Sequence, residues 1–373
     1  MLFKKIMFGV IALGLLVNPS FASDEKVSVD YAGMDYFLQI AEILQADQEP
    51  PEALWEKMFQ TSPYACAIQT EFSEKFFRRY YRLAFKPSEK DKLDKELEKK
   101  GFYIAYLRHM VKINDQWDLV KKRLKAMKQD GEIFEKAVER TASYLPGQAI
   151  AKYPGPHVGF LIFGPDGRGY ETILIDFLFF IQNRDYAETF LAHEFHHHYE
   201  SYYSVNQAGE KELVWIFDQV YKEGIADLID KREGFYNDGV MSDTKWAGRY
   251  RELVDQAPQT LRKIDRLLAQ ITREPSRLTE SAKAIKDLLP MSGHTVGYYM
   301  ADAVLGFQGK QGIMKDFGNP YRFFRRYQKM ALQPGNDHPA FSEEAMEVIR
   351  YFERKYSRTF PPRRKTSGSA NLL

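Results

Sequence analysis

A run of histidines around one glutamate is the part of this sequence whose residue types and spacing could do chemistry. Residues 193–198 read His-Glu-Phe-His-His-His, and within them His193, Glu194 and His197 fit the pattern H-E-x-x-H. On a helix, residues i and i+4 lie on the same face, so the two imidazoles could bind one metal ion. Glu194 would be turned partly aside, where its carboxylate could act as a general base rather than as a ligand.

The surrounding residues favour a helix that could be buried on one side. Residues 187–192 read Ala-Glu-Thr-Phe-Leu-Ala, which favours helix, and Phe190 and Phe195 place apolar side chains at helical spacing. The alternative is a solvated histidine cluster that scavenges metal loosely, and the apolar spacing weighs against it. His196 and His198 point elsewhere on the helix, so we expect them to be exposed or to lie behind the ligands.

A long amphipathic segment downstream offers a third ligand. Residues 212–230 place acids among large apolar residues, and Glu223 and Asp227 lie four positions apart on one face. A catalytic zinc site uses three protein ligands and keeps the fourth position for water. Glu223 could supply the third ligand, and Asp227 could accept the free N–H of a ligating imidazole. Gly224 would let another helix approach closely. The alternative is a helix whose acids are simply solvated.

These residues resemble a known group of enzymes. His193-Glu194-x-x-His197 followed by Glu223-x-x-x-Asp227 is similar to the gluzincin metallopeptidases, a branch of the zincins. The resemblance implies that the two histidines and Glu223 hold zinc, and that Asp227 orients a histidine.

The gluzincin resemblance covers about residues 187–230 and departs from the pattern in one place. The gap between the H-E-x-x-H helix and the downstream glutamate is longer than usual, which implies an insertion around Tyr202–Gly209. The wider chain, with residues 55–64 (WEKMFQTSPY) and 297–301 (GYYMA), also resembles a bacterial family described as zinc-dependent peptidases.

A later segment could supply a donor for the transition state. Peptide hydrolysis builds negative charge on the former carbonyl oxygen, and a tyrosine hydroxyl or histidine N–H aimed at that oxygen lowers the barrier. His294 and Tyr298 share a helical face, and Tyr299 lies beside them. The alternative is a histidine at a helix start and two tyrosines that only pack.

Hydrophobic periodicity predicts a mainly α protein with a small β-hairpin or sheet next to the active-site helix, an α+β zincin-like fold. Residues 158–163 and 171–176 read as two strands joined by a glycine-rich turn. Such a hairpin could pair with an extended substrate, or it could be purely structural. The expected regions are a helical N-terminal region (23–145), a catalytic core (146–240), a helical C-terminal region (241–357) and a disordered tail (358–373).

The first residues predict a secretory signal peptide. Lys4 and Lys5 precede an apolar run over residues 6–17, and small residues precede a cleavage site after Ala22. The run is too short to span a bilayer comfortably, although an uncleaved anchor is the alternative. We therefore expect residues 1–22 to be removed and the mature protein to be periplasmic or secreted, without stable membrane insertion.

Composition narrows the classes of partner. The chain has 373 residues with 53 Lys and Arg, 51 Asp and Glu, and one cysteine, Cys66. Without Lys4 and Lys5 the opposite charges balance, so nothing calls for nucleic acid or an anionic membrane. One thiol cannot form an internal disulfide, so stability must come from an ordinary core.

The sequence thus predicts an exported, Zn²⁺-dependent metallohydrolase that cleaves peptide bonds in a peptide or protein substrate. One alternative is a non-catalytic periplasmic zinc-containing binding protein with a closed, four-ligand site, to which His196 or His198 would add a ligand. Another is a peptidase fold that has lost activity, against which the intact Glu194 argues.

Overall fold

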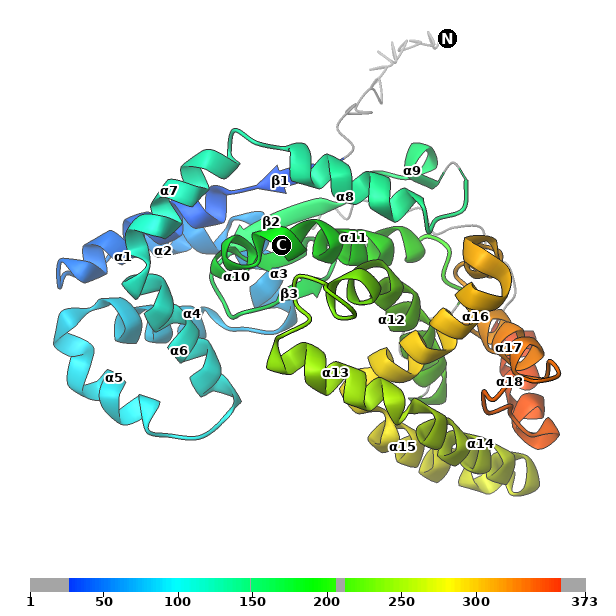
Figure 1. Cartoon of the computed structure of the whole chain (residues 1–373). Coiled ribbons are helices and arrows are strands. Elements are labelled where there is room, and N and C mark those ends of the chain that lie inside the picture. Colours follow the sequence, from blue (N-terminus) through cyan, green and yellow to red (C-terminus); the bar gives the residue numbers. More distant parts are fainter. Residues whose placement is uncertain (1–26, 148, 206–211, 357–373) are drawn as a thin grey trace, which may run out of the picture.

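A computed structural model describes residues 27–147, 149–205 and 212–356. Figure 1 shows most of the N-terminal helices (blue to cyan) at the left of the view and the C-terminal helices (yellow to red) at the right, with α11 (Arg184–Glu200) and α12 (Glu212–Gly234) between them. The expected signal peptide and the expected tail lie outside the described residues. Within the described part, none of the helices combines the length and apolarity that a bilayer crossing requires.

Eight helices, α1–α8, form the helical N-terminal region of the described chain, before α9 and the sheet strand β2 (His157–Leu161). Their aromatic side chains pack together, and the Tyr64 and Tyr81 hydroxyls meet in the core at 2.6 Å. Tyr81 also donates a hydrogen bond of 2.7 Å to the carbonyl of Ile162, which ties these helices to the chain just after that strand. The helices are α1 (Ala32–Gln45), α2 (Glu52–Phe59), α3 (Ser62–Thr70), α4 (Glu74–Phe85), α5 (Lys90–Leu97), α6 (Phe102–Asp115), α7 (Trp117–Met127) and α8 (Glu132–Ala142).

A four-stranded sheet lies next to α11, in the order β1-β2-β4-β3. β1 (Ser28–Asp30) and β4 (Ile173–Asp176) each pair in parallel with β2 (His157–Leu161), and β3 (Gly167–Gly169) pairs antiparallel with β4. The small sheet is confirmed, but the two strands expected to form an antiparallel hairpin run in parallel. The reason is that part of the predicted turn is itself a strand. β3 runs back along the outer edge, so that β4 enters between β3 and β2.

α12 and α16 (His294–Met314) cross at a contact between glycines. A Cβ atom added to Gly224 would overlap the backbone of Gly297, and one added to Gly297 would overlap the carbonyl oxygen of Val220. Only residues without a side chain allow backbones to approach this closely. The expected role of Gly224 is therefore met, and the contact brings the start of α16 beside the middle of α12.

The remaining helices complete a mainly α fold. Pro290 follows the end of α15, and Met291, Ser292 and Gly293 then take left-handed backbone angles (φ 49°, 55° and 102°) before α16 begins. One hydrophobic cluster extends from Met34 to Tyr356, through all three expected regions. The other elements are α9 (Ala149–Lys152), α10 (Phe177–Gln182), α13 (Lys245–Asp255), α14 (Ala257–Arg273), α15 (Leu278–Leu288), α17 (Pro320–Ala331), α18 (Glu343–Tyr356) and 3₁₀ turns at Pro87–Glu89, Pro275–Arg277 and Pro290–Gly293.

Candidate metal centre

A cleft of about 850 Å³ contains most of the candidate site residues. Its walls are residues 165–169, which include β3, and side chains of α11, α12 and α13, together with Met291 and His294. This volume falls within the range of roughly 300–1,000 Å³ that ligand sites usually occupy.

Three side chains in the cleft lie close enough to hold one metal ion. The Nε2 atom of His197 is 3.1 Å from Nε2 of His193 and 3.2 Å from Oε2 of Glu223. The Nε2 atom of His193 is 3.7 Å from the same carboxylate oxygen. Bonds of about 2.0 Å to a tetrahedral zinc ion place donor atoms about 3.3 Å apart, so these separations fit. Two imidazoles and one carboxylate are also a donor set that catalytic zinc uses.

The local environment keeps Glu223 in the form that binds metal. Burial alone would raise the pKa of this carboxyl group, but His197 and His294 hold it well below its usual value. The group is therefore an ionised carboxylate. The long connection that was expected between the two ligand-bearing helices lies between the end of α11 and the start of α12, and residues 206–211 of it lie outside the described part.

Glu194 lies in the same cleft, beneath the edge strand β3. Its side chain is 8% exposed, and burial raises the pKa of its carboxyl group, although His193 and His197 oppose the shift. A Cβ atom added to Gly169 of β3 would lie only 2.8 Å from Oε2 of Glu194. The glycine therefore leaves the space that this carboxylate occupies, and a raised pKa suits a group that must accept and then release a proton.

His294 reaches the centre from α16 and is held by Asp227. The Nε2 atom of His294 is 3.3 Å from Oε2 of Glu223, while its Nδ1 atom lies 3.0 Å from Oδ2 of Asp227. Tyr250 of α13 donates a hydrogen bond of 2.7 Å to the same Asp227 oxygen. Burial lowers the pKa of His294, but Asp227 and Glu223 outweigh burial and raise it above its usual value. His294 therefore presents a polarised N–H to the cleft.

The structure does not bring Tyr298 to this centre. Tyr298 is 5% exposed and packs against Tyr236 and Tyr250, with ring centroids 5.6 and 5.8 Å away. It is not among the residues that line the cleft, and neither is its neighbour Tyr299, whose hydroxyl meets Nδ1 of His338 at 2.6 Å. His294 and Tyr298 lie about one helical turn apart on α16. His294 lines the cleft, whereas Tyr298 is buried in the core.

A buried charge network that the sequence did not reveal supports His193. Its Nδ1 atom lies 3.1 Å from Oδ1 of Asp230 and 3.5 Å from Oδ1 of Asp227. Lys231 forms an ion pair with Asp230, lies 3.6 Å from Asp227, and donates a hydrogen bond of 3.1 Å to the Tyr186 hydroxyl. His193, Asp227 and Asp230 are also close enough to hold a metal, but the Lys231 ammonium already provides their cation. Of the two histidines, Asp227 is nearer to His294, and the nearer carboxylate of His193 is Asp230.

Replacing Asp230 with Asn should weaken zinc binding by about 10- to 100-fold, because the carboxylate that fixes the tautomer and orientation of His193 is lost. Competition with a chromophoric chelator measures this affinity. Asp238→Asn, an exposed change just after α12, is the matched control. Equal affinities in the two variants would contradict the role of Asp230.

The other two histidines of the run lie away from the centre. His196 is fully buried, with its ring 5.2 Å from that of Phe317, and neither ring nitrogen has a hydrogen-bond partner among the described residues. His198 lies 2.9 Å through Nε2 from the carbonyl of Pro154. Neither joins the group formed by His193, His197 and Glu223.

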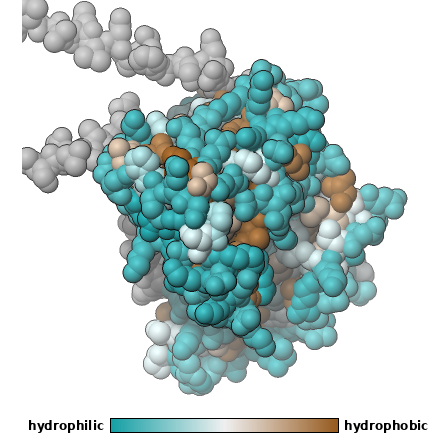
Figure 2. Space-filling view, turned by 90° about the vertical axis from the view of Figure 1, so that its left-hand side faces the viewer, coloured by the Kyte–Doolittle hydropathy of each residue, from teal (hydrophilic) through white to brown (hydrophobic). Residues whose placement is uncertain are grey.

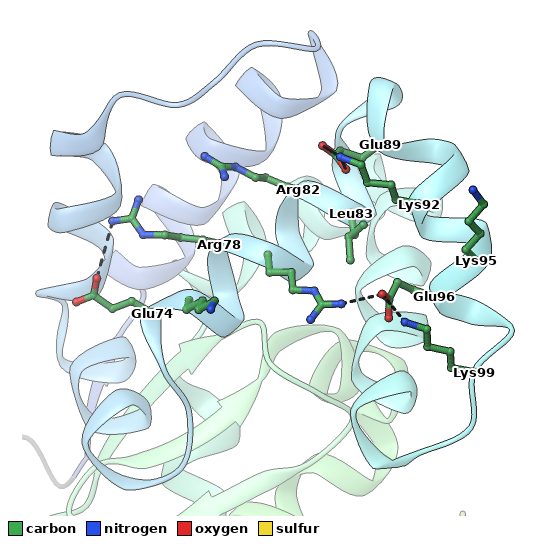
Figure 3. Close-up of a pocket in the computed structure, with 11 residues that line it drawn as sticks. Glu74, Arg78, Arg82, Leu83, Glu89, Lys92, Lys95, Glu96 and Lys99 are labelled. Atoms are coloured by element: carbon green, nitrogen blue, oxygen red, sulfur yellow. Dashed lines mark hydrogen bonds and ion pairs between the residues drawn. The ribbon is translucent and has the colours of Figure 1, made fainter.

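A second concavity, between α4 and α5, contains many charges but no candidate chemistry (Figure 3). Most of its cations are paired with acids: Arg79 lies 2.8 Å from Glu96, and Lys99 lies 2.7 Å from the same carboxylate. Arg78 pairs with Glu52 at 2.5 Å. This side of the molecule is largely hydrophilic in Figure 2. Exposed pairs of this kind contribute little to stability, at most about 1 kcal/mol each, and are typical of a solvated surface.

Comparison with known families identifies the chain. The sequence model of the family described as "Putative zinc dependent peptidase (DUF5700)" matches residues 55–335. The chain belongs to this family. The match includes strands β2, β3 and β4, both ligand-bearing helices and α16, and it agrees with the resemblance seen in the sequence. No curated protein and no solved structure matches the chain.

Zinc is the metal of this family by its description, and the described residues include groups that could hold it. The donor set of two imidazoles and an ionised carboxylate fits that metal. The family assignment and the geometry of the cleft thus agree on a zinc metallopeptidase at the level of reaction class.

Proposed function

We propose that the protein is an exported zinc metallopeptidase of the gluzincin type, in which His193, His197 and Glu223 hold the metal. When bound, zinc polarises the scissile carbonyl and lowers the pKa of a water molecule. The observation that carries the proposal is the convergence of these three donors beside Glu194 in one cleft. The family description supports the reaction class, and the signal-like first 22 residues support export.

Glu194 acts as the general base in this proposal. Its buried carboxylate accepts a proton from the attacking water and later donates that proton to the leaving amine. Its raised pKa favours this shuttle, since a carboxylate with a low pKa would be too weak a base to take a proton from water.

His294 stabilises the negative charge that develops on the carbonyl oxygen. Asp227 holds its Nδ1 side, so that the Nε2 side donates a hydrogen bond into the cleft. A donor fixed in place before the reaction needs no reorganisation as the charge forms, which is why such groups lower barriers strongly.

The edge strand β3 offers a way to hold an extended peptide. Within the described sheet, β3 pairs on one side with β4, and its residues line the cleft beside Glu194. An added peptide strand would use main-chain hydrogen bonds, so this contact would bind backbone with little sequence preference.

Removal of the metal tests the proposal. We expect the purified mature protein to contain one zinc per chain and to hydrolyse members of a mixed peptide library. A chelator should abolish hydrolysis and one equivalent of zinc should restore it, as measured by mass spectrometry of the products. Hydrolysis that persists after complete zinc removal would contradict the proposal.

A further inference from the structure

One end of the cleft is built from charged side chains beyond the metal centre. Glu200 lies three residues after His197, on the next turn of α11, and lines the cleft together with Gln219 and Lys222 of α12. The Lys222 ammonium lies 2.5 Å from Oδ2 of Asp218 and 3.6 Å from Oε2 of Glu200. Neighbouring turns of a helix place Cβ atoms about 5–6 Å apart, so this end adjoins the candidate metal centre.

Glu200 is an acid whose charge is incompletely compensated. Its side chain is 1% exposed, and its Oε1 atom has no hydrogen-bond partner among the described residues. Lys222 is nearer to Asp218 than to Glu200, so one ammonium serves two carboxylates. A buried carboxylate without full pairing costs free energy unless a cation reaches it. Consistently, burial raises the pKa of Glu200 to about 7.

The opposite end of the cleft differs in character. Phe179, Phe190, Met241 and Trp246 line it with apolar and aromatic surface. The cation there, Lys231, is already paired with Asp230. At the Glu200 end, by contrast, one ammonium, Lys222, is shared by two carboxylates, Glu200 in the cleft wall and Asp218 behind it.

We propose that Glu200 forms an acidic subsite that binds a cationic group of the substrate residue next to the scissile bond. That group is an ammonium or guanidinium, supplied either by a Lys or Arg side chain or by a free peptide amino terminus. When it binds, Lys222 stays with Asp218, and the substrate cation takes the partner place at Glu200. The proposal rests on the peptidase function and adds a substrate preference to it.

Binding to an uncleaving variant tests this subsite without relying on turnover. The zinc-loaded Glu194→Gln protein is titrated with fluorescent peptides that carry Lys, Arg or norleucine at the varied position, each with a free or acetylated amino terminus. Peptides with a cation should bind about tenfold more tightly than acetylated norleucine peptides, as a charged hydrogen bond predicts. The acetylated Lys peptide and the free-terminus norleucine peptide distinguish the two sources of charge.

Glu200→Gln in the same background keeps the shape of the side chain and removes its charge. It should reduce the cation preference to near onefold and leave binding of the neutral peptide unchanged. Asp218→Asn should also reduce the preference for cationic peptides, because Lys222 is then free to neutralise Glu200. Asp185→Asn, an exposed charge change at the start of α11, should keep the full preference.

The outcomes separate the two proposals. Tight peptide binding without any cation preference, or a preference that survives Glu200→Gln in a zinc-loaded, folded variant, would overturn the acidic subsite alone. A lack of binding by every peptide, together with a wild-type protein that hydrolyses none of them, would overturn the peptidase function and the subsite with it.

Discussion

Replacing Glu194 with Gln should lower kcat/KM for peptide hydrolysis by about 10²- to 10⁴-fold while the protein still holds one zinc per chain. Gln has nearly the same shape as Glu but cannot accept a proton at neutral pH. The space for this side chain under Gly169 should therefore remain filled, and the three proposed ligands are untouched. The change isolates proton transfer from metal binding.

Zinc content and kcat/KM on one cleaved peptide measure the effect together. Glu188→Gln is the matched control, since Glu188 lies on the same helix but pairs with Arg140 outside the cleft. The control should keep wild-type activity. A Glu194→Gln protein with normal zinc and full activity would end the proposed role of this residue as the base.

Replacing His294 with Ala should lower kcat by about 10²- to 10³-fold, with zinc retained. Under the proposal His294 acts on charge that exists only in the transition state, so KM should change much less than kcat. His294→Gln should restore part of the activity, because its amide N–H can donate a hydrogen bond from a similar position.

The His294→Ala variant also tests whether the zinc site is closed by a fourth protein ligand. The Nε2 atom of His294 is 3.3 Å from Oε2 of Glu223, a separation at which both atoms could bind the same zinc ion. A four-ligand site would suit a non-catalytic zinc protein. Loss of zinc in His294→Ala, or a cobalt spectrum that changes from four protein ligands to three, would favour that alternative over hydrolysis.

Short-range features of the centre were predictable from the sequence. The spacing of His193 and His197 fixes their relation on any helix, and Glu223 stood out as an acid on an apolar segment in a motif that resembles gluzincins. The structure brings all three together. The mainly α fold with a small sheet also followed from periodicity and is confirmed.

Long-range features were not predictable from the sequence. Asp230 looks like any acid near a helix end, and its role depends on α11 lying against α12 so that His193 faces it. Tyr298 shares a helical face with His294, but its side chain packs against Tyr236 and Tyr250, whose positions depend on the tertiary fold.

The sheet illustrates a different limit. Two strand-like segments with a glycine-rich turn between them usually form a hairpin. Here the connection is long enough to include β3, a three-residue strand too short to recognise by alternation. Periodicity identifies which segments are strands, but not the order or direction in which they pair.

The glycine contact between α12 and α16 has a consequence for how the protein responds to change elsewhere. Main chain rests on main chain at Gly224 and Gly297, one residue from Glu223 and three from His294. The distance between His294 and Glu223 is thus set by direct contact between the backbones of two helices, not by a layer of deformable side chains. Substitutions that enlarge cavities in distant helices should make the enzyme melt earlier, yet leave its turnover below the melting point almost as before.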